Sequence, residues 1–210
     1  MTNLILIRHA ETEANAQRIW NGSLDAPLTK RGEVQAAATA KRVVQLGQQA
    51  QFDAFYVSPL GRTQRTAAHI TESTGMRPII EEGLREFHLG DWEGRTLQDL
   101  HENEDLWGTW AKDPTFAPPN AESPVSFGTR AVNIIQTLAD RHVDETVLIV
   151  THGGIVANVL ASWFGNGFSE WGQWSPHNCG IAMIKLAAGN WNGIAFNDIN
   201  HLPQEAIVHR

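Results

Sequence analysis

The 210-residue sequence predicts an α/β fold, in the form of a three-layer α/β/α sandwich whose central sheet is mostly parallel and flanked by helices. Two observations lead to this fold class. Residues 3–7 and 146–150 are short, nearly continuous apolar runs, as expected of strands buried on both faces. Stretches with apolar residues at helical spacing lie between and after these runs. Strand and helix patterns thus alternate along the chain, as a parallel sheet covered by helices requires.

The first half of the chain is expected to contain two strands, each with a helix after it. Residues 29–46 have a broad apolar face at helical spacing, and Thr29 can cap the start of that helix. Residues 52–57 form a second apolar run. The helix that follows, from about residue 60 to residue 74, should end at Gly75.

A loop-rich cap is expected to interrupt this pattern between about residues 87 and 125, as an insertion in a single domain of residues 1–210. The stretch is rich in glycine and proline and contains only short helical pieces, at about 97–110. The elements expected after it are helices at 127–138 and 155–164 and strands at 181–186 and 191–196.

The charge and cysteine content limit the expected partners and compartment. The net charge of −7 argues against nucleic acid or an anionic membrane as a main partner. No glycine-rich nucleotide-binding pattern follows a strand. The single cysteine, Cys179, can form no internal disulfide, and the apolar run 4–7 is too short for a signal segment or a membrane span. A cytoplasmic location is therefore expected.

Polar residues that suit an anion follow three of the predicted strands. The first strand ends in Arg8 and His9, the second leads into SPLGRT at 58–63, and the third leads into THGG at 151–154. Ligands of open α/β sheets bind at the carboxyl ends of the strands. If these three strands are neighbours, two arginines, two histidines and two helix N-termini meet in one pocket. Such a pocket suits a phosphoryl group, because guanidinium groups donate in pairs to phosphate oxygens.

Five segments in order make the sequence resemble the histidine phosphatase (phosphoglycerate mutase-like) superfamily over nearly its whole length. They are RHAETEAN at 8–15, NGSLDAPLTKRG at 21–32, SPLGRTQRTA at 58–67, LREFHLGDWEG at 84–94 and VTHGG at 150–154. The first resembles the family's RHGxTxxN signature, and the last resembles its second histidine motif. Any one of these segments alone would be weak evidence.

The resemblance implies a role for each main residue of the pocket. His9 would be the nucleophile and form a phosphohistidine, with Arg8 and Arg62 clamping the phosphate. His152 would bind the phosphoryl group, and Glu86 would be the general acid for the leaving alkoxide. The two arginine charges are expected to lower the pKa of His9 and keep its imidazole neutral. No metal ion or cofactor is expected, because the arginines already supply positive charge.

Four further residues are expected to line the substrate site. Asn15 should contact the phosphate or order the first loop, and Thr12, Asn21 and Gly153 should lie beside it. The sequence departs from the family at Ala10, where the family usually has glycine. Alanine adds a Cβ atom next to the proposed nucleophile and puts the local backbone conformation in question.

The predicted cap favours a phosphatase over a mutase. A mutase must hold a second phosphate, which calls for extra cations, but residues 87–121 contain only Arg95 and Lys112. Seven acidic residues stand against them: Asp91, Glu93, Asp99, Glu102, Glu104, Asp105 and Asp113. The expected activity is therefore a phosphomonoesterase. The alternative is a phosphoglycerate mutase dependent on 2,3-bisphosphoglycerate, and a non-catalytic binder of phosphorylated ligands is less favoured.

The substrate is expected to be a small-molecule phosphate monoester. Trp107 and Trp110 in the cap can line an apolar pocket, which would fit α-ribazole phosphate. A sugar phosphate or a phosphoglycerate-type metabolite fits equally well. The apolar last strands are compatible with a homodimer.

Overall fold

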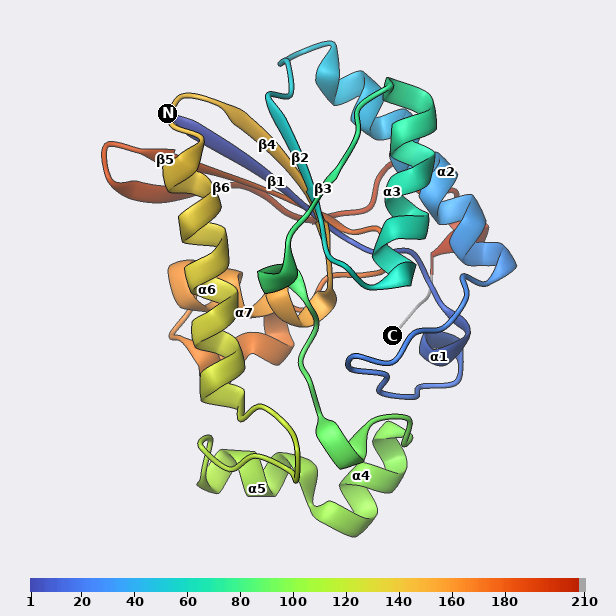
Figure 1. The fold of residues 1–210 in the computed structure, drawn as a ribbon, viewed down its shortest axis with the longest axis vertical. Helices are drawn as coiled ribbons and strands as arrows, with labels where there is room; N and C mark the ends of the chain where they lie inside the picture. Colours follow the sequence, from blue (N-terminus) through green and yellow to red (C-terminus); the bar gives the residue numbers. More distant parts are fainter. Residues whose placement is uncertain (208–210) are drawn as a thin grey trace.

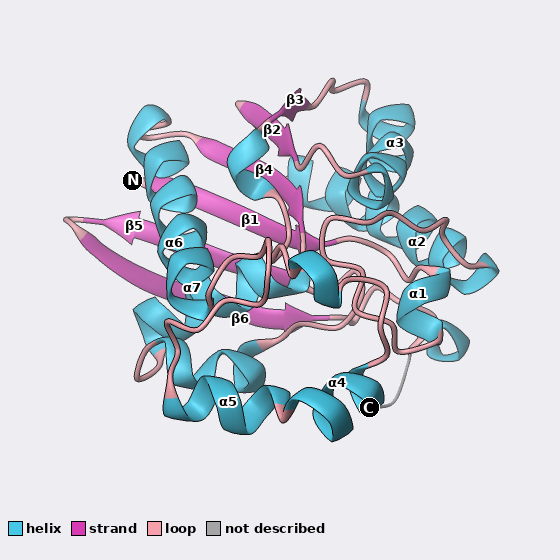
Figure 2. Cartoon of the chain, turned by 60° about the horizontal axis from the view of Figure 1, so that its bottom comes forward, coloured by secondary structure: helices cyan, strands magenta, loops and turns pink. Residues whose placement is uncertain are grey.

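The computed structural model, which describes residues 1–207, contains a six-stranded sheet in the order β3-β2-β4-β1-β5-β6 (Figure 1). The strands are β1 (Thr2–Arg8), β2 (Ala54–Val57), β3 (Ile79–Ile80), β4 (Thr146–Thr151), β5 (Ile181–Ala187) and β6 (Asn190–Asp198). The first four of these strands are parallel, and β5 and β6 are antiparallel to their neighbours (Figure 2). The predicted α/β class with a mostly parallel sheet is confirmed.

Two pairs of helices cover the two faces of the sheet. The helices are α1 (Glu13–Ala16), α2 (Lys30–Gly47), α3 (Gly61–Thr74), α4 (Leu97–Glu104), α5 (Leu106–Lys112), α6 (Pro124–Arg141) and α7 (Gly153–Phe164). Ile5 and Ile7 of β1 pack with α2 and α3. Leu4 and Leu6 pack with α6 and α7. Both faces of β1 are thus buried, which explains its unbroken apolar sequence.

The helix ends lie close to their predicted positions because side chains and glycine fix them. Thr29 Oγ1 accepts a hydrogen bond from Gly32 N at 2.9 Å and starts α2. Gly75, with φ of +75°, ends α3 in the left-handed conformation that glycine adopts without strain. Within residues 1–207, none of the helices has both the length and the apolar character to cross a membrane.

The cap segment, which we define as residues 87–125, contains α4 and α5 and packs onto the rest of the chain. Leu100 and Leu106 are fully buried in the same apolar cluster as Leu4 and Leu6 of the sheet. A short antiparallel ribbon also joins this segment to the first loop, because Ile19 pairs with Thr96. The cap segment lies beyond the carboxyl ends of β1, β2 and β4 (Figure 1).

Candidate active site

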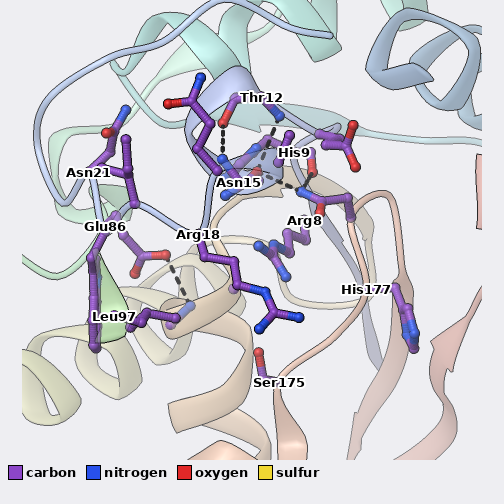
Figure 3. A pocket seen from close by; sticks show the side chains of 18 of the residues that line it. Arg8, His9, Thr12, Asn15, Arg18, Asn21, Glu86, Leu97, Ser175 and His177 are labelled. Atoms are coloured by element: carbon purple, nitrogen blue, oxygen red, sulfur yellow. Dashed lines mark hydrogen bonds between the residues drawn. The ribbon is translucent and has the colours of Figure 1, made fainter. Parts of the chain in front are cut away.

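The sheet order brings the three predicted strand ends together, because β2, β4 and β1 are adjacent. They border a cavity of about 1050 Å³ between the sheet and the cap segment. Eight of the nine predicted site residues line this cavity: Arg8, His9, Thr12, Asn15, Asn21, Arg62, Glu86 and Gly153. Several of them point into it from different elements (Figure 3). The ninth, His152, is fully buried behind His9, with the two ring centroids 5.3 Å apart.

The surroundings of His9 fix which of its ring nitrogens carries the proton. His9 Nδ1 lies 2.7 Å from the carbonyl oxygen of Ala10, and a carbonyl oxygen can only accept. Nδ1 is therefore the protonated nitrogen, and Nε2 carries the lone pair. Burial lowers the pKa of His9 well below its usual value, with further lowering by Arg62 and Arg8. The arginine charges were expected to do this, but burial is the larger cause.

Ala10 fits where the related family usually has glycine. Its side chain is fully buried in a small apolar cluster with Leu28, Ala36, Cys179 and Leu202. Its N–H donates to Thr66 Oγ1 at 3.0 Å, and its backbone is not in the left-handed region. The extra Cβ atom therefore contributes to packing and imposes no backbone strain.

Backbone carbonyl groups hold the guanidinium groups of Arg8 and Arg62 at the cavity. Arg8 NH1 donates to the carbonyl oxygen of Pro176 at 2.7 Å. Arg62 donates to the carbonyl oxygens of Leu24 and Gly22, both at 2.7 Å, and is 3% exposed. A guanidinium has five N–H donors, so Arg62 keeps donors for a ligand after making these two bonds. The carbonyl bonds also fix the orientation of the cation before a ligand arrives.

His152 has one bonded ring nitrogen and one that is buried without a partner. Its Nε2 lies 2.7 Å from Ser58 Oγ. Its Nδ1 has no hydrogen-bond partner among residues 1–207, although it is fully buried. Burial lowers the pKa of His152, followed by the charge of Arg62, so the ring is neutral at neutral pH. A buried polar atom without a partner is costly unless a ligand supplies one.

The carboxylate of Glu86 lies against the N-terminus of α7, and backbone N–H groups hold it in place. Its two carboxylate oxygens accept from Phe87 N at 3.0 Å and from Gly154 N at 3.1 Å. A Cβ atom on Gly154 would come within 2.2 Å of the Glu86 carboxylate, so this position needs glycine for the close approach. Glu86, from the segment at 84–94, therefore lines the same cavity as His9.

The predicted residues of the first loop hold one another in place. Thr12 caps α1 by accepting from Asn15 N, and Asn15 Oδ1 accepts from Thr12 N in return, both at 3.2 Å. Asn178 then donates to Asn15 Oδ1 at 3.0 Å and to the carbonyl oxygen of His9 at 3.1 Å. No motif in the sequence marks Asn178 as a site residue. The side-chain nitrogen of Asn15, Nδ2, has no hydrogen-bond partner within residues 1–207 and is available to a ligand.

An aromatic wall, formed by Trp20, Trp107 and Trp171, encloses another side of the cavity. Their rings lie 6.1 to 6.3 Å apart and come from the first loop, α5 and the 3₁₀ segment Phe168–Trp174. The prediction that Trp107 lines the pocket is confirmed. Trp110 instead lies behind the wall, 6% exposed and 5.9 Å from Trp20.

The two cations of the cap do not reach the cavity. Arg95 forms ion pairs with Asp99 and, at 2.6 Å, with Glu104. The side chain of Lys112 is 82% exposed and lies 3.9 Å from Asp105. Neither residue lines the cavity. Arg18, which the sequence analysis did not single out, does line it, and its side chain points inward (Figure 3).

Acid is expected to weaken the fold through three histidines, of which His9 and His152 are buried and His201 is half-buried. Burial is the largest cause that lowers the pKa values of His9, His152 and His201, the last to about 4. In the unfolded chain these groups titrate near 6.5. Below that pH the unfolded chain binds more protons, so the stability they contribute is full above about pH 6.5 and is lost as pH falls.

We expect the Tm to be constant from about pH 7 to 8 and to fall between about pH 6.5 and 5. Thermal unfolding followed by circular dichroism in phosphate-free buffers measures this. His201→Gln, which removes one of the three groups and can keep a bond to Thr39, should show a shallower fall. A Tm that rises on acidification would contradict the explanation.

Comparison with known proteins places these motifs in one family. The model of the histidine phosphatase superfamily (branch 1) matches residues 4–199. "Putative phosphoserine phosphatase 2" of Hydrogenobacter thermophilus is 30% identical, covering 97% of this chain and 99% of the relative. "Probable phosphoglycerate mutase GpmB" of Serratia proteamaculans is 32% identical, covering 99% and 98%.

Solved structures also support the family assignment. Phosphoserine phosphatase from Entamoeba histolytica superposes with a TM-score of 0.84 at 28% identity, covering 97% of this chain and all of that one. The relatives carry both phosphatase and mutase names. These names agree on the family but do not distinguish between the two reactions. With a family match from residue 4 to residue 199, the chain belongs to the histidine phosphatase superfamily, branch 1.

Proposed function

We propose that this chain is a phosphomonoesterase that hydrolyses a small phosphorylated metabolite through a phosphohistidine on His9. The state of the His9 ring carries the proposal. The ring is neutral, its Nδ1 proton is bound to Ala10, and its Nε2 lone pair is available in a cavity with Arg8 and Arg62. A neutral imidazole beside fixed cations suits attack on a phosphoryl group.

The first step would transfer the phosphoryl group to the enzyme. His9 Nε2 attacks phosphorus, the bond between phosphorus and the leaving oxygen breaks, and protonated Glu86 gives its proton to that oxygen. Arg8, Arg62 and Nδ2 of Asn15 would hold the phosphoryl oxygens as negative charge redistributes in the transition state. These cations supply the positive charge, so the step requires no metal ion or cofactor.

His152 would donate to the same phosphoryl group through Nδ1. Ser58 Oγ lies 3.4 Å from Leu60 N, a donor, and its own proton can then point to His152 Nε2. That arrangement puts the ring proton of His152 on Nδ1, the atom without a protein partner in residues 1–207. A phosphoryl oxygen would satisfy this donor, which is why we place His152 in the phosphate site.

The second step would release phosphate. Water attacks the phosphohistidine, Glu86 takes a proton from that water, and the bond between phosphorus and Nε2 breaks. His9 regains its lone pair, and Glu86 is again protonated, so the cycle is complete. In a mutase the phosphoryl group would instead return to a second oxygen of a bound ligand. The 2,3-bisphosphoglycerate-dependent mutase is the alternative, because several relatives carry a mutase name.

Hydrolysis of p-nitrophenyl phosphate, phosphoserine and 3-phosphoglycerate in the presence of EDTA tests the proposal. We expect phosphate release without added metal, and a phosphoenzyme that is stable in base and labile in acid after quenching. The same samples, supplied with 2,3-bisphosphoglycerate, are examined for conversion of 3-phosphoglycerate to 2-phosphoglycerate. Isomer exchange that exceeds hydrolysis would replace the phosphatase by the mutase. Loss of all turnover in EDTA, restored by a metal, would overturn the mechanism.

A further inference from the structure

Among residues 1–207, the cavity has one arginine that neither the phosphoryl chemistry nor a protein acceptor engages. Four arginines line it, and three have protein acceptors: Arg8 and Arg62 at backbone carbonyls and Arg31 at Glu11, with three contacts of 2.7 to 3.1 Å. Arg18 is exposed, and its guanidinium has no hydrogen bond or ion pair to any residue from 1 to 207. Its side chain nevertheless points into the cavity (Figure 3).

The backbone of Arg18 has an unusual conformation that two hydrogen bonds hold. Arg18 follows the end of α1 with φ of +56°, in the left-handed region that favours glycine. Its N–H donates to Asn15 O at 3.1 Å, and its carbonyl oxygen accepts from Leu97 N at 3.0 Å. The chain thus ties both sides of this residue to neighbouring elements and keeps a long cationic side chain where glycine would be less strained.

We propose that Arg18 is a specificity-determining residue that binds a carboxylate on the body of the substrate, and this inference rests on the proposed phosphatase function. A guanidinium donates two parallel hydrogen bonds to a carboxylate. A singly charged group matches the cavity, because Arg8 and Arg62 are assigned to the phosphoryl group and Arg31 is paired with Glu11, which leaves the single charge of Arg18 for the body of the substrate. The aromatic wall bounds the space in which the rest of the body lies.

Two pairs of substrates that differ in one group isolate this contact. Phosphoserine exceeds phosphoethanolamine by a carboxylate, and 3-phosphoglycerate has a carboxylate where glycerol 3-phosphate has a hydroxymethyl group. We expect the wild-type kcat/KM to favour the carboxylate member of each pair. Arg18→Gln should reduce that preference by about 10- to 100-fold, the range of a charge-assisted pair, mainly through KM. Arg18→Lys should retain part of it, because lysine keeps the charge without the two parallel donors.

Two controls separate binding from folding. Arg18→Gly suits the left-handed backbone, so its Tm should equal or exceed that of the wild type while the preference is lost. Arg141→Gln removes an exposed arginine of α6 outside the cavity and should leave the preference unchanged. A wild type without the preference, or a preference that survives in Arg18→Gln, would overturn the inference.

Calorimetric binding keeps the inference testable if turnover fails. Failure of every substrate, p-nitrophenyl phosphate included, would contradict the proposed function and not the assignment of Arg18. The four paired ligands are then titrated into the wild type and into Arg18→Gln. Tighter binding of the carboxylate ligands that depends on Arg18 supports the assignment, and equal binding of the two members of each pair contradicts it.

Discussion

His9→Ala is expected to reduce the hydrolysis of every phosphomonoester by about 10⁴-fold or more. The variant loses Nε2 of His9, which faces the cavity with a free lone pair because Nδ1 carries the proton bonded to Ala10. His152 cannot replace it, because its ring is fully buried and its Nε2 is bound to Ser58. The measurement is kcat and kcat/KM with p-nitrophenyl phosphate in EDTA, together with the search for a base-stable phosphoenzyme.

The same variant is expected to keep its phosphate site. Arg8 and Arg62 are held by the carbonyl oxygens of Pro176, Leu24 and Gly22, and none of these contacts involves His9. Inorganic phosphate should therefore still raise the Tm of His9→Ala, as we also expect for the wild type. Binding without turnover is the result that identifies His9 as the nucleophile.

His69→Ala provides the matched control. His69 lies on α3, outside the cavity, and pairs with Glu33 at 2.8 Å. Its removal should leave kcat within about twofold of the wild type, since surface changes of this kind have small effects. Turnover that survives in His9→Ala would show that another group attacks phosphorus.

The elements that position His9 were predictable because their sequence signals are local. A strand buried on both faces reads as an unbroken apolar run, and Thr29 and Gly75 mark helix ends in the residues themselves. The predicted strand at 52–57 begins later, at Ala54. The two-residue strand β3 was missed, because it exists only through pairing with Tyr56 and Val57 of β2.

The site residues that were missed have no local signal of their own. Trp20 and Arg18 reach the cavity because the first loop pairs with residues 94–97, far along the chain. Asn178 reaches His9 because the chain returns past β1 before it enters β5. The motif residues could be placed because they follow the predicted strand ends. The positions of Trp20, Arg18 and Asn178 depend instead on which distant segments of the chain lie together. A sequence-based prediction therefore finds the proposed phosphoryl site more readily than the cavity residues that distant segments contribute.

Glu86→Gln is expected to slow hydrolysis of alkyl phosphates such as glycerol 3-phosphate by about 10²- to 10⁴-fold, the usual worth of a positioned proton donor. Glutamine keeps the size of the side chain and an oxygen that can accept from Gly154 N, so the start of α7 should be preserved. What it loses is the ability to give a proton to the leaving oxygen. An alkoxide needs that proton, whereas p-nitrophenolate is a weak base and leaves without it.

The two steps of the reaction should therefore separate in this variant. With p-nitrophenyl phosphate, transfer to His9 should stay rapid. The attack of water on the phosphohistidine should slow, because in the proposed mechanism Glu86 also takes the proton from water. Rapid-quench measurements should then show a burst of about one p-nitrophenolate per active site and an accumulated phosphoenzyme. With an alkyl phosphate the first step is slow, so neither the burst nor the phosphoenzyme should appear.

Glu82→Gln is the control, since Glu82 is exposed, pairs with Arg85 and lies outside the cavity. It should behave as the wild type with both substrates. An equal loss with the two substrates in Glu86→Gln, with no burst, would mean that Glu86 only holds the N-terminus of α7. A burst with p-nitrophenyl phosphate alone requires a group that handles protons at the leaving oxygen and at water. Among the carboxylates that line the cavity within residues 1–207, Glu11 is bound to Arg31, which leaves Glu86 for that role.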